Sequence, residues 1–220
     1  MRTASKLDEK RPRQRQADRT LETRRRVLDA TIKCLYKVGY SAVTFAMVAD
    51  EACVSRGIIS YHFKTKADLM VAVRKAVQLQ EQQLNLDIIQ MIGVEAYLRE
   101  LPRHVMSGMR REPAIAVNEI LLAARAYPDL SEKLRVEEKR IDEVSIQHLR
   151  LLYVDASITP PTNLMIRMRV AVAAFRGLAI LELAQGDDAE TEACIAYLME
   201  MLTPPEQIAT ADPTAPTRMK

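Results

Sequence analysis

Residues 54–69 read VSRGIISYHFKTKADL, and this stretch predicts two helices separated by a short break. Ser55 is a good N-cap for a short helix that ends near Phe63, because a Ser side chain accepts hydrogen bonds from first-turn N–H groups. Thr65, with Asp68 three positions later, forms a capping-box pattern that opens a longer helix. The polar side chains of the stretch leave three roles open: chemistry, recognition of a nucleic acid, or cover for an apolar core.

The residues on either side of this stretch complete a helix-turn-helix arrangement. A helix over about residues 21–38 is expected to end at Gly39, and Thr44 caps a second short helix that runs to about Ala52. The buried face of the first helix is expected to carry Val27, Thr31, Leu35 and Val38. The buried face of the helix that opens at Thr65 is expected to carry Leu69, Val73, Val77, Gln80 and Leu84.

The composition favours an all-α protein, because 48% of the 220 residues are hydrophobic and only 6 are Gly. The longest apolar run, residues 170–184, is interrupted by two charges and is shorter than the roughly 20 residues of a membrane-spanning helix. The start of the chain is polar and basic, unlike a secretion signal. The cysteines fit reduced thiols in a helical core: Cys34, Cys53 and Cys194. We therefore expect a cytoplasmic protein that has no membrane contact and needs neither a metal nor a cofactor.

Charge is unevenly distributed along the chain. Residues 1–75 carry 17 Lys and Arg against 8 Asp and Glu, a net charge of +9, whereas residues 76–220 carry 15 against 21, a net charge of −6. The first third is therefore the expected surface for a polyanion, with residues 1–20 as a basic flexible arm.

Residues 24–70 resemble the DNA-binding domain of TetR-family transcriptional regulators. The matching positions are Gly39, Tyr40, Thr44, Val48, Ala49, Val54, Ser55, Gly57, Ile59, His62, Phe63, Lys66 and Leu69. Within them, the GIISYHF segment, residues 57–63, resembles the choline-responsive betaine regulators. The chain departs from the family pattern at Phe45, at Ser60 and at Cys53, which stands where a Gly is usual. The position of Cys53 tends to need a positive φ, which costs a residue other than Gly roughly 1 kcal/mol.

The resemblance implies that Ser55 contacts DNA and that the helix beginning there lies in the major groove. Arg56 would read a guanine and Gly57 would let the helix approach closely. Ser60 can donate one hydrogen bond, with less reach than the Tyr usual there. Phosphate contacts would come from Thr44, Tyr61, His62 and Lys66. Ile59 and Phe63 are expected in the core instead.

The rest of the chain is expected to be helical, with breaks at its Pro and Gly residues. The expected helices are one that starts near Val94 and those over 102–111, 113–127, 130–154, 162–185 and 188–202. We expect a DNA-binding domain over 21–67, an effector-binding and dimerisation domain over 68–203, and a disordered tail over 204–220. The helix over 162–185 is apolar on nearly every side, so more than one neighbour should pack on it.

The resemblance implies that the last two helices pair with their copies in a homodimer. The residues expected at this interface are Ala173, Gly177, Leu181, Ala184, Ala193 and Tyr197. The core of a monomer is the alternative for the same residues. An effector pocket is implied among the middle helices, because Met side chains adapt to irregular ligands. Its expected residues are Met106, Met109, Asn118, Leu122, His148 and Met168, with Glu119 as a further polar candidate. Ordinary core and surface positions are the alternative for these.

We therefore predict a repressor that binds a palindromic operator as a homodimer and is released by a small, largely apolar effector. The alternative is a ligand-binding or scaffold dimer whose helix-turn-helix reads no sequence. Catalysis through His104 or His148 has little support, because neither has partners at triad or metal spacing. Cys53 is open to two interpretations, a redox switch or a small buried residue.

Overall fold

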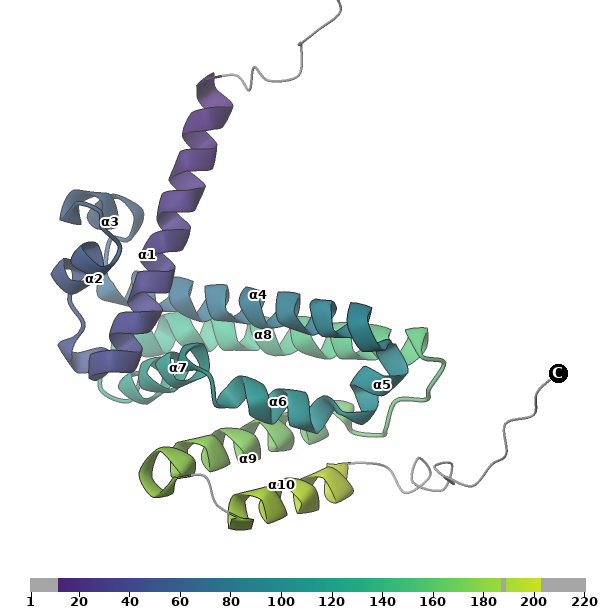
Figure 1. Ribbon diagram of the computed structural model, residues 1–220. Coiled ribbons are helices and arrows are strands. Elements are labelled where there is room, and N and C mark those ends of the chain that lie inside the picture. Colours follow the sequence, from purple (N-terminus) through teal and green to yellow (C-terminus); the bar gives the residue numbers. More distant parts are fainter. Residues whose placement is uncertain (1–11, 187–188, 203–220) are drawn as a thin grey trace, which may run out of the picture. The chain divides into compact units, whose positions relative to one another are not determined.

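The computed structural model describes residues 12–186 and 189–202, and every regular element in these ranges is a helix (Figure 1). The expectation of an all-α fold is thus confirmed. The helices are α1 (Pro12–Ala42), α2 (Phe45–Glu51), α3 (Arg56–His62), α4 (Lys66–Ile92), α5 (Val94–Arg99), α6 (Leu101–Met109), α7 (Glu112–Ala123), α8 (Pro128–Asp155), α9 (Leu164–Gln185) and α10 (Ala189–Leu202). None of them, as far as the chain is described, is long and apolar enough to cross a membrane.

Helix α1 differs from its expected bounds at both ends. It begins at Pro12, so residues 12–20 of the expected flexible arm are helical; residues 1–11 and the expected tail lie outside the described ranges. At its other end the helix is broken at Gly39, where φ is 72° and ψ is 169°, before a last short turn to Ala42. Gly39 therefore ends the first straight segment, as predicted, because a positive φ is available to Gly at little cost.

The chain packs as two compact units. The first contains the described residues up to Gln78 together with Ile115–Glu137, and the second contains Leu79–Ala114 together with the described residues from Glu138 onward. Helices α4, α7 and α8 contribute residues to both units. This is a division by packing, and the functional boundary between residues 67 and 68 stays a prediction.

The first unit has one core, which α1, α2, α3 and α4 share with residues from α7 and α8. Leu69, Val73 and Val77 are buried in it, but Gln80 and Leu84 are exposed, because the core of this unit ends at Val77. Val38 is also exposed, since it lies next to the break at Gly39. Ile59 and Phe63 are buried, which confirms that they serve the core rather than a ligand.

The second unit has two apolar clusters. One joins Met106 of α6 to Phe175 of α9 and Ile195 of α10. The other joins α8 residues, including Leu149, to Leu164 at the start of α9. Helix α9 is therefore packed by more than one neighbour, as its all-round apolar character predicted. It starts at Leu164 rather than at residue 162, after Asn163 with a left-handed φ of 63°.

Candidate nucleic-acid interface

Helix α2 ends in a tight turn that sets the start of α3. Cys53 has a φ of 52°, and the N–H groups of Cys53 and Val54 donate to the carbonyls of Asp50 and Ala49 at 3.2 and 3.0 Å. These two bonds make the Schellman motif, in which a left-handed residue follows the helix end. The sequence-based prediction of a positive φ at residue 53 is confirmed. Cys53 is exposed, so its interpretation as a small buried residue is wrong; of the three cysteines only Cys34 is buried.

The two N-caps of the motif behave differently. Thr44 Oγ1 accepts a hydrogen bond from the Met47 N–H at 3.2 Å, as a capping side chain should. Ser55 has the extended backbone of an N-cap, with φ −74° and ψ 150°, but its side chain makes no capping hydrogen bond. The backbone conformation expected of an N-cap at Ser55 is thus confirmed, but the expected hydrogen bond to its hydroxyl is absent.

Helix α3 presents a polar face to solvent and an apolar face to the core. Arg56, Gly57 and Ser60 are exposed, and Tyr61 is 75% exposed. Ile59, on the opposite face, is fully buried. A Cβ added at Gly57 would meet only Ser55 Oγ at 3.8 Å, an ordinary contact, so the fold itself does not require a Gly here. The exposed face therefore carries hydrogen-bonding groups on a helix whose other side is anchored.

The end of α3 is fixed by aromatic and cationic contacts. His62 is half-buried, and its ring lies edge-on to that of Tyr61, with centroids 5.2 Å apart. The Arg24 guanidinium lies over the Phe63 ring, 5.4 Å from its centroid. Lys66 Nζ donates to the Tyr40 carbonyl at 2.6 Å and lies 4.3 Å from the centre of the Tyr40 ring, and burial lowers the pKa of this lysine. In this structure Lys66 thus serves the packing of α1 against α4, whereas its predicted phosphate contact stays a prediction.

The last turn of α1, after the break at Gly39, is held by α7. Glu119 Oε2 accepts a hydrogen bond from the Tyr40 N–H at 3.0 Å, and the Tyr40 ring lies against that of Tyr127, with centroids 5.0 Å apart. Burial, with smaller effects from Tyr127 and Asp129, raises the pKa of Tyr40. Glu119 therefore positions the helix-turn-helix. The sequence carried no signal for this, because the two partners lie far apart along the chain.

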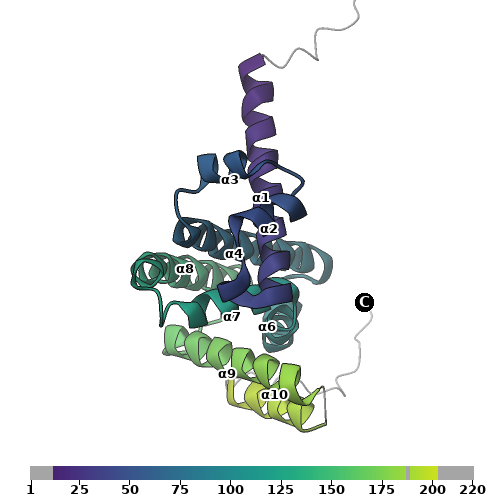
Figure 2. The ribbon, with the colours of Figure 1, turned by 90° about the vertical axis from the view of Figure 1, so that its left-hand side faces the viewer.

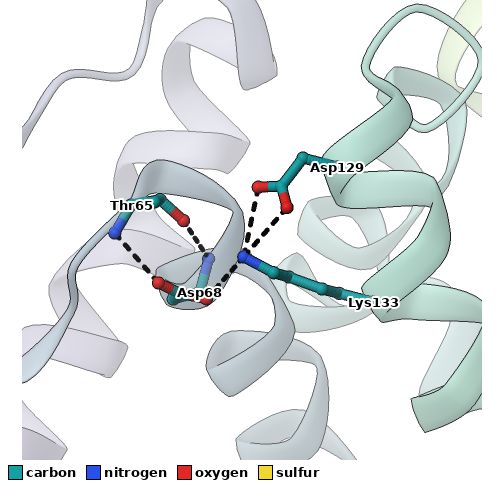
Figure 3. Close-up of polar contacts among 4 residues, drawn as sticks. All are labelled: Thr65, Asp68, Asp129 and Lys133. Carbon is teal, nitrogen blue, oxygen red and sulfur yellow. Dashed lines mark hydrogen bonds and ion pairs between the residues drawn. The ribbon is translucent and has the colours of Figure 1, made fainter.

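The start of α4 is held by α8 (Figure 3). The Thr65 N–H donates to Asp68 Oδ2 at 3.0 Å and the Asp68 N–H donates to Thr65 Oγ1 at 3.1 Å, which confirms the predicted capping box. Lys133 Nζ lies 2.8 Å from Asp68 Oδ1 and 3.0 Å from Asp129 Oδ1. The hydrogen bond from Lys133, followed by those from Thr65, lowers the pKa of Asp68. Nothing in the sequence singles out Lys133 as a partner of Asp68, because the two residues lie far apart along the chain.

The predicted effector residues are spread over both units. Met106 and Met109 belong to one apolar cluster of the second unit, and Met168 belongs to the other. His148 is half-buried in that unit, and its Nε2 is buried without a hydrogen-bond partner. Asn118 and Leu122 lie in the first unit. Asn118 is 7% exposed with an unpartnered Oδ1, whereas Leu122 is 68% exposed.

The predicted dimer residues form an exposed apolar face on α9 and α10. All six are exposed: Ala173, Gly177, Leu181, Ala184, Ala193 and Tyr197. All but Ala184 line an open groove of about 560 Å³, whose lining is almost entirely apolar. Arg110, the residue directly after α6, links the two helices of this face: its Nη2 lies 2.6 Å from Glu182 of α9 and 3.2 Å from Glu192 of α10. The structure thus brings these residues together on one surface, outside the cores of the described chain.

No metal centre is evident in the described part of the chain, where no three His, Cys, Asp or Glu side chains gather as metal ligands would. His104 stacks on Tyr97, with ring centroids 5.2 Å apart and an angle of 8° between the rings. Burial raises the pKa of Tyr97 to about 12. Neither His104 nor His148 has a nucleophile or carboxylate placed beside it in the described contacts.

Comparison with known proteins agrees with this geometry. The sequence model of the family described as bacterial regulatory proteins, tetR family, matches residues 27–73, which span α1 to the first part of α4. The regulator BetI of Klebsiella pneumoniae is 41% identical over 64 residues, 28% of this chain and 33% of BetI. The regulator SrpR of Pseudomonas putida is 23% identical over 159 residues, 71% of each chain.

The similarity to solved structures extends over most of the chain. The multidrug binding protein EbrR, in its complex with imidazole, is 27% identical with a TM-score of 0.56 over 83% of this chain and 90% of EbrR. The helix-turn-helix and the helices that follow it thus have counterparts in a solved structure, whereas the BetI similarity is confined to a third of that protein.

Proposed function

The chain is a DNA-binding transcriptional regulator of the TetR family, and from this premise we propose that it is a homodimeric repressor of a palindromic operator. The observation that carries the proposal is the two-sided α3, which exposes Arg56, Gly57, Ser60 and Tyr61 while it buries Ile59. A helix fixed on one side and polar on the other suits the major groove, which is wide enough to admit it.

Each exposed side chain of α3 has a role that its chemistry supports. Arg56 can donate two hydrogen bonds to O6 and N7 of a guanine, the commonest specific contact of a protein with DNA. Gly57 leaves room for a close approach to the bases. Ser60 and Tyr61 can donate to bases or phosphates, and Thr44 and His62 are proposed as phosphate contacts on either side. Lys66 would reach a phosphate only by leaving the Tyr40 carbonyl.

A twofold assembly would place two copies of α3 on one side of a duplex. We propose that the apolar groove lined by Ala173, Gly177, Leu181, Ala193 and Tyr197, together with the adjacent Ala184, is covered by a second copy of this chain. Small residues allow close approach of helices, and burial of apolar surface favours association. A twofold dimer matches a palindrome whose half-sites lie about 34–36 Å apart.

Release of the operator by a small, largely apolar effector completes the proposal. Met106, Met109 and Met168 offer adaptable apolar contacts, and Leu122 offers an exposed one. In the second unit the unpartnered His148 Nε2 can take a polar group of the effector, because a buried polar atom without a partner costs about 1–3 kcal/mol, whereas Asn118 and Leu122, in the first unit, stay predictions. EbrR, the similar protein of known structure, is a multidrug binding protein.

The effector would act by a shift of population between two states of the dimer. A ligand that favours the state unable to span two half-sites by about 3 kcal/mol would lower operator occupancy more than a hundredfold. Helix α4 is the proposed connection, since it contributes residues to both units.

Selection of random duplex DNA by the purified chain, at about 0.15 M salt, tests the proposal, because binding through phosphates alone is weak at that salt. Enrichment of one palindrome is the expected result. Binding that only fades with salt and enriches no sequence would refute the repressor and favour the scaffold dimer. A screen of apolar compounds against the selected duplex then tests release.

A further inference from the structure

The N-terminal part of α1 is a polar helix that projects past the helix-turn-helix. From residue 18 onward, where burial in α1 is described, the first buried residue is Val27, and residues 18–26 contribute none to the core. The Arg24 guanidinium lies over Phe63, directly after the end of α3, so the preceding residues extend beyond that point. Figures 1 and 2 both show this end of α1 running past α3.

This projecting segment has no apolar face with which to bind a protein. Between residues 18 and 26, Leu21 is the one apolar side chain, and it is 67% exposed. A helix that is polar on all sides gains little stability from packing against apolar surfaces. We therefore expect it to bind a polar partner. The partner should be anionic, because residues 12–26 contain six Arg against two acidic residues.

Two of these arginines are placed for contact with a regular polyanion. Arg25 is already paired with Glu22, at 3.1 Å. Arg19 and Arg26 are both exposed, and Arg26 adds only its charge to the lowering of the Glu22 pKa, since the ion pair of Glu22 is with Arg25. They stand seven positions apart, so they share one face and are separated by about 10 Å along the axis. Each strand of duplex DNA carries one phosphate per about 3.4 Å of helix axis, so two guanidinium groups this far apart can contact two different phosphates.

We propose that the face of α1 with Arg19 and Arg26 is a second DNA contact, which binds backbone phosphates beside the groove that α3 enters. The proposal rests on the proposed function for the position of the duplex, but it concerns affinity rather than sequence. Guanidinium groups on phosphates carry no sequence information, so this contact strengthens binding to every duplex equally.

The test compares the full-length chain with the variant Arg19→Gln/Arg26→Gln, because Gln keeps the helix propensity and removes both charges. Affinity is measured against salt concentration for the selected duplex and for a scrambled duplex of the same length. Each lost phosphate contact should reduce the slope of log K against log salt by about 0.9, so the double variant should lose about 1.8 on both duplexes. At about 0.15 M salt this corresponds to roughly thirtyfold weaker binding.

The matched control is Arg135→Gln/Lys139→Gln, two exposed positions of α8 with the same change in net charge. Its slope should stay that of the natural chain. The inference is overturned if the Arg19→Gln/Arg26→Gln slope is also unchanged, or if the variant loses its preference for the selected duplex, which would mean base reading. If the natural chain shows no sequence preference, the proposed function is refuted. The phosphate contact is still tested in that case, by the salt dependence of binding to the scrambled duplex.

Discussion

Glu119 of α7 accepts a hydrogen bond from the backbone N–H of Tyr40, with 3.0 Å between Oε2 and the nitrogen. The bond falls where α1 breaks, and a Cβ on Gly39 would lie only 2.9 Å from the same carboxylate oxygen. A side chain at residue 39 would therefore crowd the Glu119 carboxylate, and Gly39 leaves room for it. Through this bond α7 supports the turn from which α2 and α3 follow.

Replacement of Glu119 tests this support. Glu119→Ala leaves the N–H of the buried Tyr40 without its partner, and we expect a loss of about 1–3 kcal/mol in the free energy of unfolding. Glu119→Gln keeps a carbonyl oxygen and should lose less. Urea denaturation measures both, with Glu132→Ala, at an exposed position of α8, as the control. Equal stability of the Ala and Gln variants would show that the hydrogen bond contributes nothing.

The variant Gly57→Ala tests whether Gly57 is required for folding stability or for DNA binding. The added Cβ meets nothing closer than 3.8 Å, so the variant should be more stable by roughly 0.5–1 kcal/mol, the usual gain of Ala over Gly in a helix. The same methyl group would stand between α3 and the bases, and operator affinity should fall by about tenfold or more. Gly108→Ala, in α6, has open space around its Cβ and should leave DNA binding unchanged. A Gly57→Ala variant with full affinity would contradict the proposed approach of α3.

The ion pair between Asp68 and Lys133 predicts that the folding stability decreases at low pH. The pKa of Asp68 is lowered in the folded chain, chiefly by the hydrogen bond from Lys133. Its contribution is therefore complete above the unfolded value of about 3.9 and is lost as the pH falls through the lower folded value. Lys133→Met keeps the aliphatic stem and removes the main cause of the shift.

We expect the melting temperature of Lys133→Met to fall less between pH 5 and pH 3 than that of the natural chain. Thermal unfolding monitored by circular dichroism at several pH values measures this. Lys139→Met, at an exposed position of the same helix, should keep the natural acid dependence. Parallel curves for Lys133→Met and the natural chain would contradict the role given to this pair.

The groove on α9 and α10 predicts how the chain associates. Leu181 lines the groove and is 50% exposed, whereas Leu183, 62% exposed on the same helix, does not line it. Leu181→Glu would bury a charge against apolar surface, so we expect a dimer constant weakened at least tenfold and a monomer in sedimentation at micromolar concentration. Leu183→Glu should remain dimeric. A dimer that tolerates Leu181→Glu would show that another surface joins the copies.

Short-range patterns in the sequence were sufficient to predict the helix caps and the turn of the helix-turn-helix. The N-cap at Thr44, the capping box of Thr65 with Asp68 and the left-handed turn at Cys53 each depend on residues within a few positions of one another. Such short-range chemistry can be identified without a structure. Ile59 and Phe63, which the family resemblance led us to expect in the core, are both buried.

What the sequence could not supply are the long-range partners. Glu119 and Lys133 meet Tyr40 and Asp68 across wide separations in the chain, and periodicity says nothing about such pairs. Lys66 was expected to face DNA, but its stem packs inward and its charge reaches the Tyr40 carbonyl. The prediction that Gln80 and Leu84 are buried was wrong. Helical periodicity continues along α4, but the core of the first unit ends before these residues.

The central claim is that the exposed face of α3 reads a DNA sequence, and Arg56 tests it most directly. The measurement is the ratio of affinities for the selected and the scrambled duplex, at one salt concentration, for the natural chain and for Arg56→Ala. The account predicts that this ratio falls by roughly 10- to 100-fold, the value of one bidentate base contact, while binding to the scrambled duplex changes little. An unchanged ratio for Arg56→Ala would contradict the claim.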